Sequence, residues 1–422
     1  MHWPKNRGAS QHLITTGEHL RIDYERNRRS PSLDAPVGGI MDRQPMSHEL
    51  TPPEMEPKVF VGSQSGLVAA LSAGNGATAW HNTFSHMEVD RLIHVEDLIC
   101  VASYVTPSQD NQQTAHLFAL RTHDGTLRWQ LTKGIEMAGP TFLVGDGDLL
   151  FATFGMGIGA IYAVQAQTGG VEWIDRVPDE SQFRLIAADK GKVYVRLAAS
   201  ESSGHAHGRH RPTGLKALDG QTGQVLWMSH DCPSSALLVA SNDVIYTYGI
   251  ALNRERTITT LDLAQGLTLG KLSLRNTDSV LAIARDGVAF VIRQTQMIAL
   301  RIADGVELWS IGYPYDAHKY LVRSTFHVAL TDEFLYYAQI SDSDQSLVVG
   351  SLAVNTGKRA WQWASDTDDA LHVNAVRLAV DADAVYLTTP RGIFSLDARD
   401  GHLRWHTLRS VDLSFVSPAV LV

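Results

Sequence analysis

The sequence predicts an all-β protein, an eight-bladed β-propeller of four-stranded antiparallel blades. Two observations support that prediction. One is a repeated frame in which an apolar anchor is followed five residues later by glycine and four residues after that by tryptophan. The other is the distance between successive frames, 39 to 54 residues, because a four-stranded blade needs about 40–50 residues. Helical periodicity is absent from residues 59–422, which excludes an α/β or helical alternative.

Eight segments share the frame, and the clearest is ALRTHDGTLRW, which ends at Trp129. We interpret the glycine as the turn before the outer strand, where it takes a positive φ without steric cost. The turn glycines are Gly76, Gly125, Gly169, Gly223, Gly266, Gly305, Gly357 and Gly401. The last position of the frame is Gly270 in the fifth repeat and tryptophan in the other seven: Trp80, Trp129, Trp173, Trp227, Trp309, Trp361 and Trp405.

Each repeat divides into four strands by alternation and turn residues, as in the third, with strands over 139–145, 149–154, 161–166 and from 171 onward. The first repeat lacks an innermost strand, since the residues before 59 are proline-rich and do not alternate. The missing strand is expected at the other end of the chain, in SFVSPAVLV. We predict that this C-terminal strand pairs with residues 59–63 and closes the ring, which removes two open sheet edges.

The length of 422 residues suggests two or three domains, but the repeats indicate one, over residues 58–422. Residues 1–57 are polar, contain seven prolines and show no sustained period, so we predict a disordered extension. The formal charge of -9 argues against a nucleic-acid partner. No transmembrane segment and no signal peptide are found. As written, the chain is expected in the cytoplasm, and a different true start would allow export.

The frame resembles the PQQ-like repeat of the quinoprotein alcohol dehydrogenase-like propellers, over about residues 59–422. The resemblance implies that each frame tryptophan docks between adjacent blades. This role suits a large planar side chain whose N–H can still reach a neighbouring turn. Gly270 departs from the pattern, so the fifth blade is expected to make the weakest contact with a neighbouring blade.

The resemblance leaves several functions open, because fold does not determine function. One class consists of non-catalytic scaffolds such as the outer-membrane assembly lipoprotein; another consists of PQQ-dependent alcohol or sugar dehydrogenases that also bind calcium. A small-ligand sensor propeller is a third alternative. The alcohol dehydrogenases stack the quinone against a vicinal disulfide, whereas the two cysteines, Cys100 and Cys232, are 132 residues apart. We therefore predict a non-catalytic, monomeric propeller without a cofactor that binds a protein partner.

The partner is expected on the face that carries the long loops between second and third strands, at 105–114, 200–214 and 341–346. The second of these loops holds a histidine cluster that is either a transition-metal site or a solvent-exposed loop: His205, His207 and His210. The same face carries aspartates that could bind calcium or a basic partner, or only form a solvated edge: Asp342, Asp344, Asp366, Asp368 and Asp369.

Residues at the starts of innermost strands are expected at the entrance of the central channel. The candidates are polar and of mixed charge: Glu88, Glu136, Asp278, Arg323 and Asn374. They could bind a small ligand or simply hydrate a water-filled channel.

Overall fold

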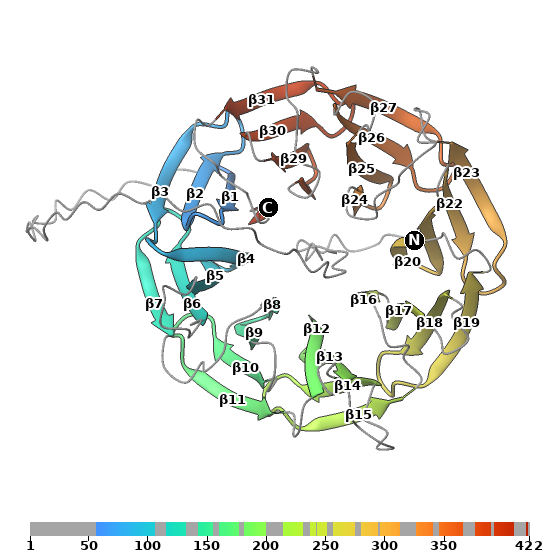
Figure 1. The fold of residues 1–422 in the computed structure, drawn as a ribbon, viewed down its shortest axis with the longest axis horizontal. Helices are drawn as coiled ribbons and strands as arrows, with labels where there is room; N and C mark the ends of the chain where they lie inside the picture. Colours follow the sequence, from blue (N-terminus) through green and yellow to red (C-terminus); the bar gives the residue numbers. More distant parts are fainter. Residues whose placement is uncertain are drawn as a thin grey trace, which may run out of the picture.

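The fold is a closed ring of eight four-stranded antiparallel sheets, seen face-on in Figure 1. The structure, a computed structural model, describes residues 56–105, 115–131, 142–154, 160–176, 181–199, 214–230, 237–241, 243–250, 256–274, 280–293, 296–312, 326–340, 346–365, 376–389, 392–408 and 419–420. All regular elements in these ranges are strands. The predicted fold class, an all-β propeller with eight blades, is therefore confirmed.

The blades in the first half of the ring follow one another along the chain. Blade 1 contains β1 (Lys58–Gly62), β2 (Leu67–Ser72) and β3 (Thr78–Thr83); blade 2 contains β4 (Met87–Val95), β5 (Leu98–Val105), β6 (Ala115–Arg121) and β7 (Leu127–Leu131); blade 3 contains β8 (Phe142–Asp146), β9 (Leu149–Phe154), β10 (Ala160–Gln165) and β11 (Val171–Arg176); blade 4 contains β12 (Ser181–Asp189), β13 (Lys192–Ala199), β14 (Gly214–Asp219) and β15 (Val225–Ser229).

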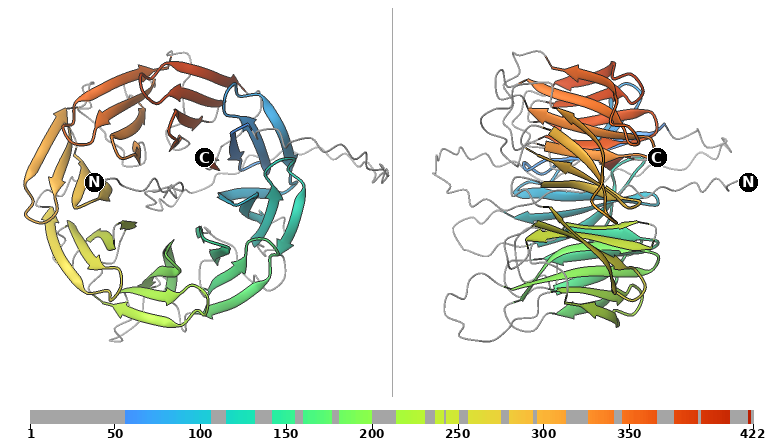
Figure 2. Two further views of the ribbon diagram at one scale, coloured as in Figure 1. Left: turned by 180° about the vertical axis from the view of Figure 1, so that it is seen from behind. Right: turned by 90° about the vertical axis from the view of Figure 1, so that its right-hand side faces the viewer.

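The second half repeats the arrangement. Blade 5 contains β16 (Leu237–Ser241), β17 (Val244–Ile250), β18 (Arg256–Asp262) and β19 (Thr268–Leu274); blade 6 contains β20 (Val280–Arg285), β21 (Val288–Ile292), β22 (Gln296–Arg301) and β23 (Glu307–Gly312); blade 7 contains β24 (Phe326–Leu330), β25 (Phe334–Ile340), β26 (Leu347–Ala353) and β27 (Arg359–Ala364); blade 8 contains β28 (Arg377–Val380), β29 (Ala384–Thr389), β30 (Gly392–Asp397) and β31 (Leu403–Leu408). Seen edge-on, the ring of blades forms a disc (Figure 2).

The ring closes as the sequence predicts. The last described strand, β32 (Ala419–Val420), pairs antiparallel with β1, with Phe60 opposite Ala419 and Val59 opposite Val420. Blade 1 therefore contains three strands from the start of the domain and one from its end, in the order β3-β2-β1-β32. Because this pairing covers the inner edge of β1, the closed ring hides a strand edge that would otherwise be open.

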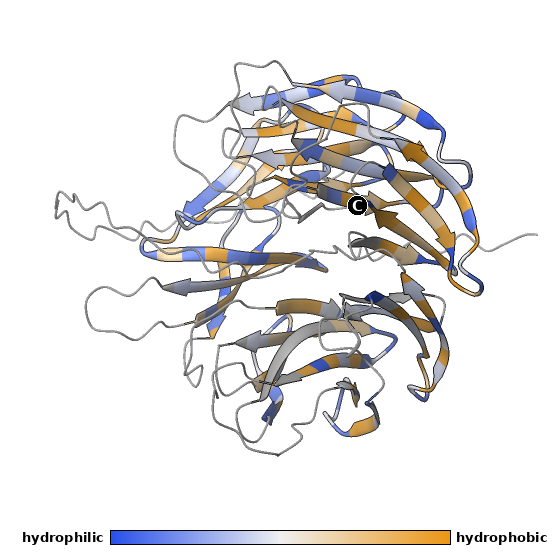
Figure 3. Cartoon of the chain, turned by 45° about the vertical axis from the view of Figure 1, so that its right-hand side comes forward, coloured by the Kyte–Doolittle hydropathy of each residue, from blue (hydrophilic) through white to orange (hydrophobic). Residues whose placement is uncertain are grey.

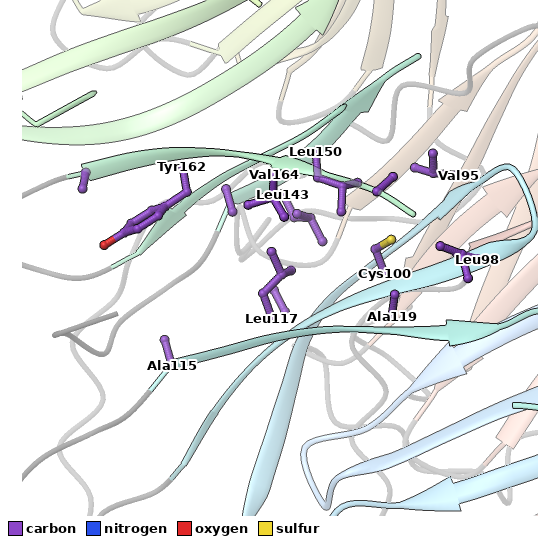
Figure 4. Packing of buried hydrophobic residues seen from close by; sticks show 14 residues of the cluster. Val95, Leu98, Cys100, Ala115, Leu117, Ala119, Leu143, Leu150, Tyr162 and Val164 are labelled. Carbon is purple, nitrogen blue, oxygen red and sulfur yellow. The ribbon is translucent and has the colours of Figure 1, made fainter. Parts of the chain in front are cut away.

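The core consists of eight apolar clusters, one at each junction between neighbouring blades. In β6, Leu117 and Ala119 face blade 3 while Phe118 and Leu120 face blade 1. Side chains of a strand alternate between its two faces, and both faces of a blade are covered here, so the middle strands are apolar throughout. Figure 4 shows the junction between blades 2 and 3, and Figure 3 shows that the apolar residues lie in the strands.

The turn before each outer strand has the same construction in every blade. In blade 2, the N–H of Gly125 donates to the carbonyl of Arg121 at 2.9 Å, and Gly125 has a φ of 74°. The glycine is needed because other residues reach this conformation only with strain. The pairing register shifts just before each anchor, for example between Ala119 and Leu120, so every outer strand starts from a bulge.

Candidate functional site

Each frame tryptophan packs on the turn glycine of the next blade, as the family resemblance implies. A methyl group added to Gly125 would lie 2.6 Å from the Trp80 ring, so only glycine allows the indole to pack this closely. The indole N–H then donates to a backbone carbonyl beside that turn. The seven bonds are Trp80 to Thr122 (2.9 Å), Trp129 to Ala166 (2.6 Å), Trp173 to Gly220 (2.9 Å), Trp227 to Leu263 (3.3 Å), Trp309 to Val354 (2.7 Å), Trp361 to Ala398 (2.9 Å) and Trp405 to Ala73 (2.8 Å).

The junction between blades 5 and 6 is built differently, because Gly270 stands at the tryptophan position of β19. Here Leu272, two residues further along, reaches the turn glycine of blade 6, with its Cδ1 2.9 Å from the position of a Cβ on Gly305. The hydroxyl of Tyr246 accepts a hydrogen bond from the N–H of Gly287 at 3.0 Å. An aliphatic side chain and a tyrosine hydroxyl thus connect these two blades, where an indole does so elsewhere.

Most of the predicted site residues lie outside the described residues, so the structure does not show whether they come together. This applies to the histidine cluster (His205, His207 and His210) and to the acidic group (Asp342, Asp344, Asp366, Asp368 and Asp369). It also applies to four channel candidates, Glu136, Asp278, Arg323 and Asn374. Among the residues that the structure does describe, no three His, Cys, Asp or Glu side chains form a group that could hold a metal ion.

Glu88 is the one channel candidate within the described residues. It lies in β4, the innermost strand of blade 2, and its carboxylate accepts a hydrogen bond from the Tyr104 hydroxyl on β5 at 2.5 Å. Further along β4, the Arg91 guanidinium lies over the Phe142 ring of blade 3, 5.6 Å from the ring centroid. This cation–π contact connects the innermost strands of two blades.

Sequence analysis missed two charged or titratable residues on the innermost strands of blades 7 and 8. Burial lowers the pKa of His327 on β24 to about 3, with the positive charge of Arg377 as a second cause. Burial also lowers the pKa of Arg377 on β28, assisted by the like charge of Arg91. The candidates chosen from sequence lie mainly in the segments between blades. The signal that would have identified Arg377 is a charged residue within an otherwise apolar innermost strand, VRLAV at 376–380.

The environment of Cys100 does not fit a quinone site of the vicinal-disulfide type. Cys100 lies in β5 between Ile99 and Val101 and is fully buried in the apolar cluster between blades 2 and 3 (Figure 4). Burial raises the pKa of its thiol to about 12, so the thiol is unreactive at neutral pH. This cysteine fills core space, and we derive no chemistry through a quinone.

Large apolar side chains are exposed on the outer strands, mostly on blades 4 to 6. The two most exposed belong to blade 5, Leu267 at 60% and Leu269 at 59%. We call the exposed apolar side chains of blades 4, 5 and 6 the outer-rim patch: Val225, Leu226, Met228, Leu267, Leu269, Val306 and Leu308. Figure 1 places their strands, β15, β19 and β23, in succession on the outer circumference.

Solved structures resemble the fold at low identity. The crystal structure of BamB from Moraxella catarrhalis matches with a TM-score of 0.52 and 16% identity, over 80% of this chain and 89% of that one. The dihydro-heme d1 dehydrogenase NirN matches with a TM-score of 0.58 and 10% identity, over 89% and 77%. Apo AztD from Citrobacter koseri matches with a TM-score of 0.55 and 13% identity, over 86% and 98%. At these identities the likeness concerns the fold alone.

Sequence comparison is more specific. The outer membrane protein assembly factor BamB of Yersinia pestis is 25% identical over 268 residues, which cover 60% of this chain and 63% of that protein. The chain thus spans less than two thirds of that relative's length. The family described as outer membrane protein assembly factor BamB matches residues 32–184 and 214–412. Because this match includes most of the ring, the chain belongs to the BamB family.

Proposed function

We propose that the protein is a non-catalytic scaffold that binds a protein partner during the assembly of outer membrane proteins. The observation that carries the proposal is the family match, which extends over residues 32–184 and 214–412 and so includes strands from all eight blades. The name of the Yersinia pestis relative, outer membrane protein assembly factor BamB, supplies the assembly role.

The structure supports a rigid scaffold through its junctions. Indoles fasten neighbouring blades at seven of the eight junctions, and the last of them, from Trp405 to Ala73, joins the two ends of the domain. A ring fixed in this way holds its outer strands in constant relative positions. Rigid presentation of this kind lowers the entropic cost of binding a partner.

The partner site is proposed on the face with the long loops, at 105–114, 200–214 and 341–346. Nearly all of these loop residues lie outside the described residues, so the proposal rests on the lengths of the loops, which vary from blade to blade. The compartment belongs to the same proposal. A protein that assists outer membrane assembly is expected to work outside the cytoplasm, and cell fractionation of the native host with detection of the native protein tests this.

Affinity purification from the native host at natural abundance, followed by mass spectrometry, tests the proposed function. We expect a protein partner in constant ratio to the propeller and no bound quinone. A parallel assay adds PQQ and calcium to the purified protein and follows dye reduction with alcohols and sugars. Turnover that requires PQQ would establish a dehydrogenase and overturn the scaffold function, and a small molecule recovered in place of a protein would indicate a sensor.

A further inference from the structure

The outer strand of blade 5 combines three features that occur together nowhere else on the described rim. Blade 5 exposes the two most accessible large apolar residues of the described rim, Leu267 directly before β19 and Leu269 within it, and β19 lacks the frame tryptophan. With seven residues, β19 is also the longest outer strand. We propose that the outer-rim patch, centred on β19, is a docking surface for an extended apolar segment of the partner protein. This inference rests on the proposed scaffold function and assigns a second contact surface to it.

The backbone edge of β19 is open to a further strand. In the described part of the chain, β19 pairs with β18 and forms the outer end of its sheet. Natural edge strands avoid unwanted pairing by carrying charges or prolines. In the outer-rim patch charges are few, since β15 holds none, β19 only Lys271 and β23 only Glu307. By contrast, β11 carries Glu172, Asp175 and Arg176. An edge that is apolar and open suits strand addition, in which backbone hydrogen bonds give affinity and alternate side chains give specificity.

Because Gly270 replaces a tryptophan, one junction lacks the indole N–H that donates to a backbone carbonyl in the other seven. In seven junctions, the carbonyl two residues after the anchor of the next blade accepts an indole N–H, as Thr122 does from Trp80. At the junction of blades 5 and 6, the counterpart is the carbonyl of Ile302. No indole donates to it, because Gly270 stands where the other outer strands carry tryptophan. Among the described residues, a Cβ on Gly270 would meet only the Thr260 hydroxyl, at 3.2 Å.

The extent and curvature of the patch decide which occupant fits. Side chains on three successive blades take part, and the rim that carries them is convex (Figure 1). Two convex rims touch each other over a small area, whereas a stable interface buries roughly 800 Å² per partner. An extended segment can follow the curve and cover all three blades, so we assign the surface to such a segment.

Site-specific photocrosslinking in the native host tests the assignment. The photoreactive residue p-benzoylphenylalanine replaces Leu269, and in a matched control it replaces Ala79. Both residues directly precede the last position of the frame, on the outer strands of blades 5 and 1, and both are exposed. Crosslinks from position 269 to one recurring segment of one protein, several-fold more abundant than from position 79, are expected. Equal yields, or crosslinks from 269 to a second copy of the chain or to lipid, would overturn the proposal.

Peptide binding tests the same surface without the cell. The segment identified by its crosslink is synthesised, and its affinity is measured for the whole protein and for the variants Leu269→Lys and Ala79→Lys. Because both side chains are exposed, neither variant is expected to lower the melting temperature by more than about 1 °C. Leu269→Lys should weaken binding at least tenfold and Ala79→Lys less than twofold. If Leu269→Lys still retains the partner in affinity purification, the scaffold function holds and the rim surface is wrong; PQQ-dependent turnover with no partner refutes the function itself.

Discussion

The junction between blades 8 and 1 and the junction between blades 5 and 6 represent two ways of joining neighbouring blades. At the first, the buried Trp405 lies against Gly76 and donates to the carbonyl of Ala73 at 2.8 Å. At the second, the half-buried Leu272 reaches Gly305 and forms no polar contact there. The first junction must hold the two ends of the domain together, whereas the second joins blades that are already linked by the chain.

This difference indicates where the ring can tolerate a weaker contact. A break at the closing junction separates β32 from β1 and exposes an inner strand edge. A weak contact between blades 5 and 6 leaves the ring closed, since seven indole contacts remain. The blade that lacks the frame tryptophan is also the blade with the two most exposed large apolar side chains. We interpret this coincidence to mean that blade 5 lacks a packing contact at its junction with blade 6 and presents apolar side chains on its outer strand instead.

The largest expected effect comes from truncating the side chain at each junction. Trp405→Ala removes a buried indole and its hydrogen bond and should lower the free energy of unfolding by about 3–5 kcal/mol. Leu272→Ala removes a smaller, half-buried side chain and should cost about 1–2 kcal/mol. Urea denaturation of both variants measures the two values. Equal losses would show that the junctions do not differ in strength and would contradict the expectation that blade 5 makes the weakest contact.

The junctions also differ in the titratable residues of their innermost strands. The innermost strand of blade 7 contributes the largely buried His327, whose Nε2 has no hydrogen-bond partner among the described residues. The described strands β16 and β20 of blades 5 and 6 contain no histidine. Because burial lowers the pKa of His327 to about 3 in the folded protein, the unfolded chain binds its proton more readily below pH 6.5. Stability from this residue is therefore full above pH 6.5 and falls as the pH drops toward 3.

The free energy of unfolding is expected to fall by about 1–2 kcal/mol between pH 6.5 and pH 4.5, after allowance for solvent near the side chain. Chemical denaturation at a series of pH values measures it. His327→Gln removes the titration and should flatten the acid side of the profile, whereas Ala79→Gln on the outer strand of blade 1, which removes no titratable group, should leave it unchanged. A profile as steep in His327→Gln as in the natural protein would assign the acid sensitivity to other groups.

Sequence analysis predicted the fold well because the frame records packing that every blade repeats. Gly125 must adopt a positive φ and must leave room for Trp80, so both residues are visible in sequence as a pattern. The closing strand was predictable for the same reason, since the first repeat lacks one strand. The exposure of Leu269 was not predictable from alternation, because it depends on which blades and turns surround the strand. The roles of His327 and Arg377 depend on contacts between blades and also escape a strand-by-strand interpretation.

Substitution of the turn glycines separates backbone strain from packing. Gly76 and Gly305 both have a φ of 73°, so an alanine at either position costs about 1–2 kcal/mol in backbone strain. The new Cβ at Gly76 would lie 2.6 Å from the buried Trp405 ring, but at Gly305 it meets only the flexible end of Leu272, at 2.9 Å. Gly76→Ala should therefore cost about 1–3 kcal/mol more than Gly305→Ala, as overpacking of a core usually does. Thermal unfolding of the two variants compares them, and equal melting temperatures would show that the indole yields as easily as the leucine.

The smallest expected effect is a gain of stability when the missing indole is supplied. Gly270 has no positive φ, so an extended tryptophan can stand there, and the ring should reach Gly305 and the carbonyl of Ile302. Trp129 and Trp309 tolerate Leu131 and Ile311 two residues further on, so Leu272 need not be removed. Gly270→Trp should stabilise the ring by about 1 kcal/mol and raise the melting temperature by about 2 °C.

Gly270→Val is the matched control for this gain, because it adds a side chain that favours strands but cannot reach across the junction. If the valine variant gains as much as the tryptophan variant, the increase comes from strand propensity and blade 5 never lacked a docking contact. A melting temperature below that of the natural protein would show that Leu272 already fills the space. If only the tryptophan variant gains stability, the natural glycine at position 270 makes the junction between blades 5 and 6 less stable than an indole would.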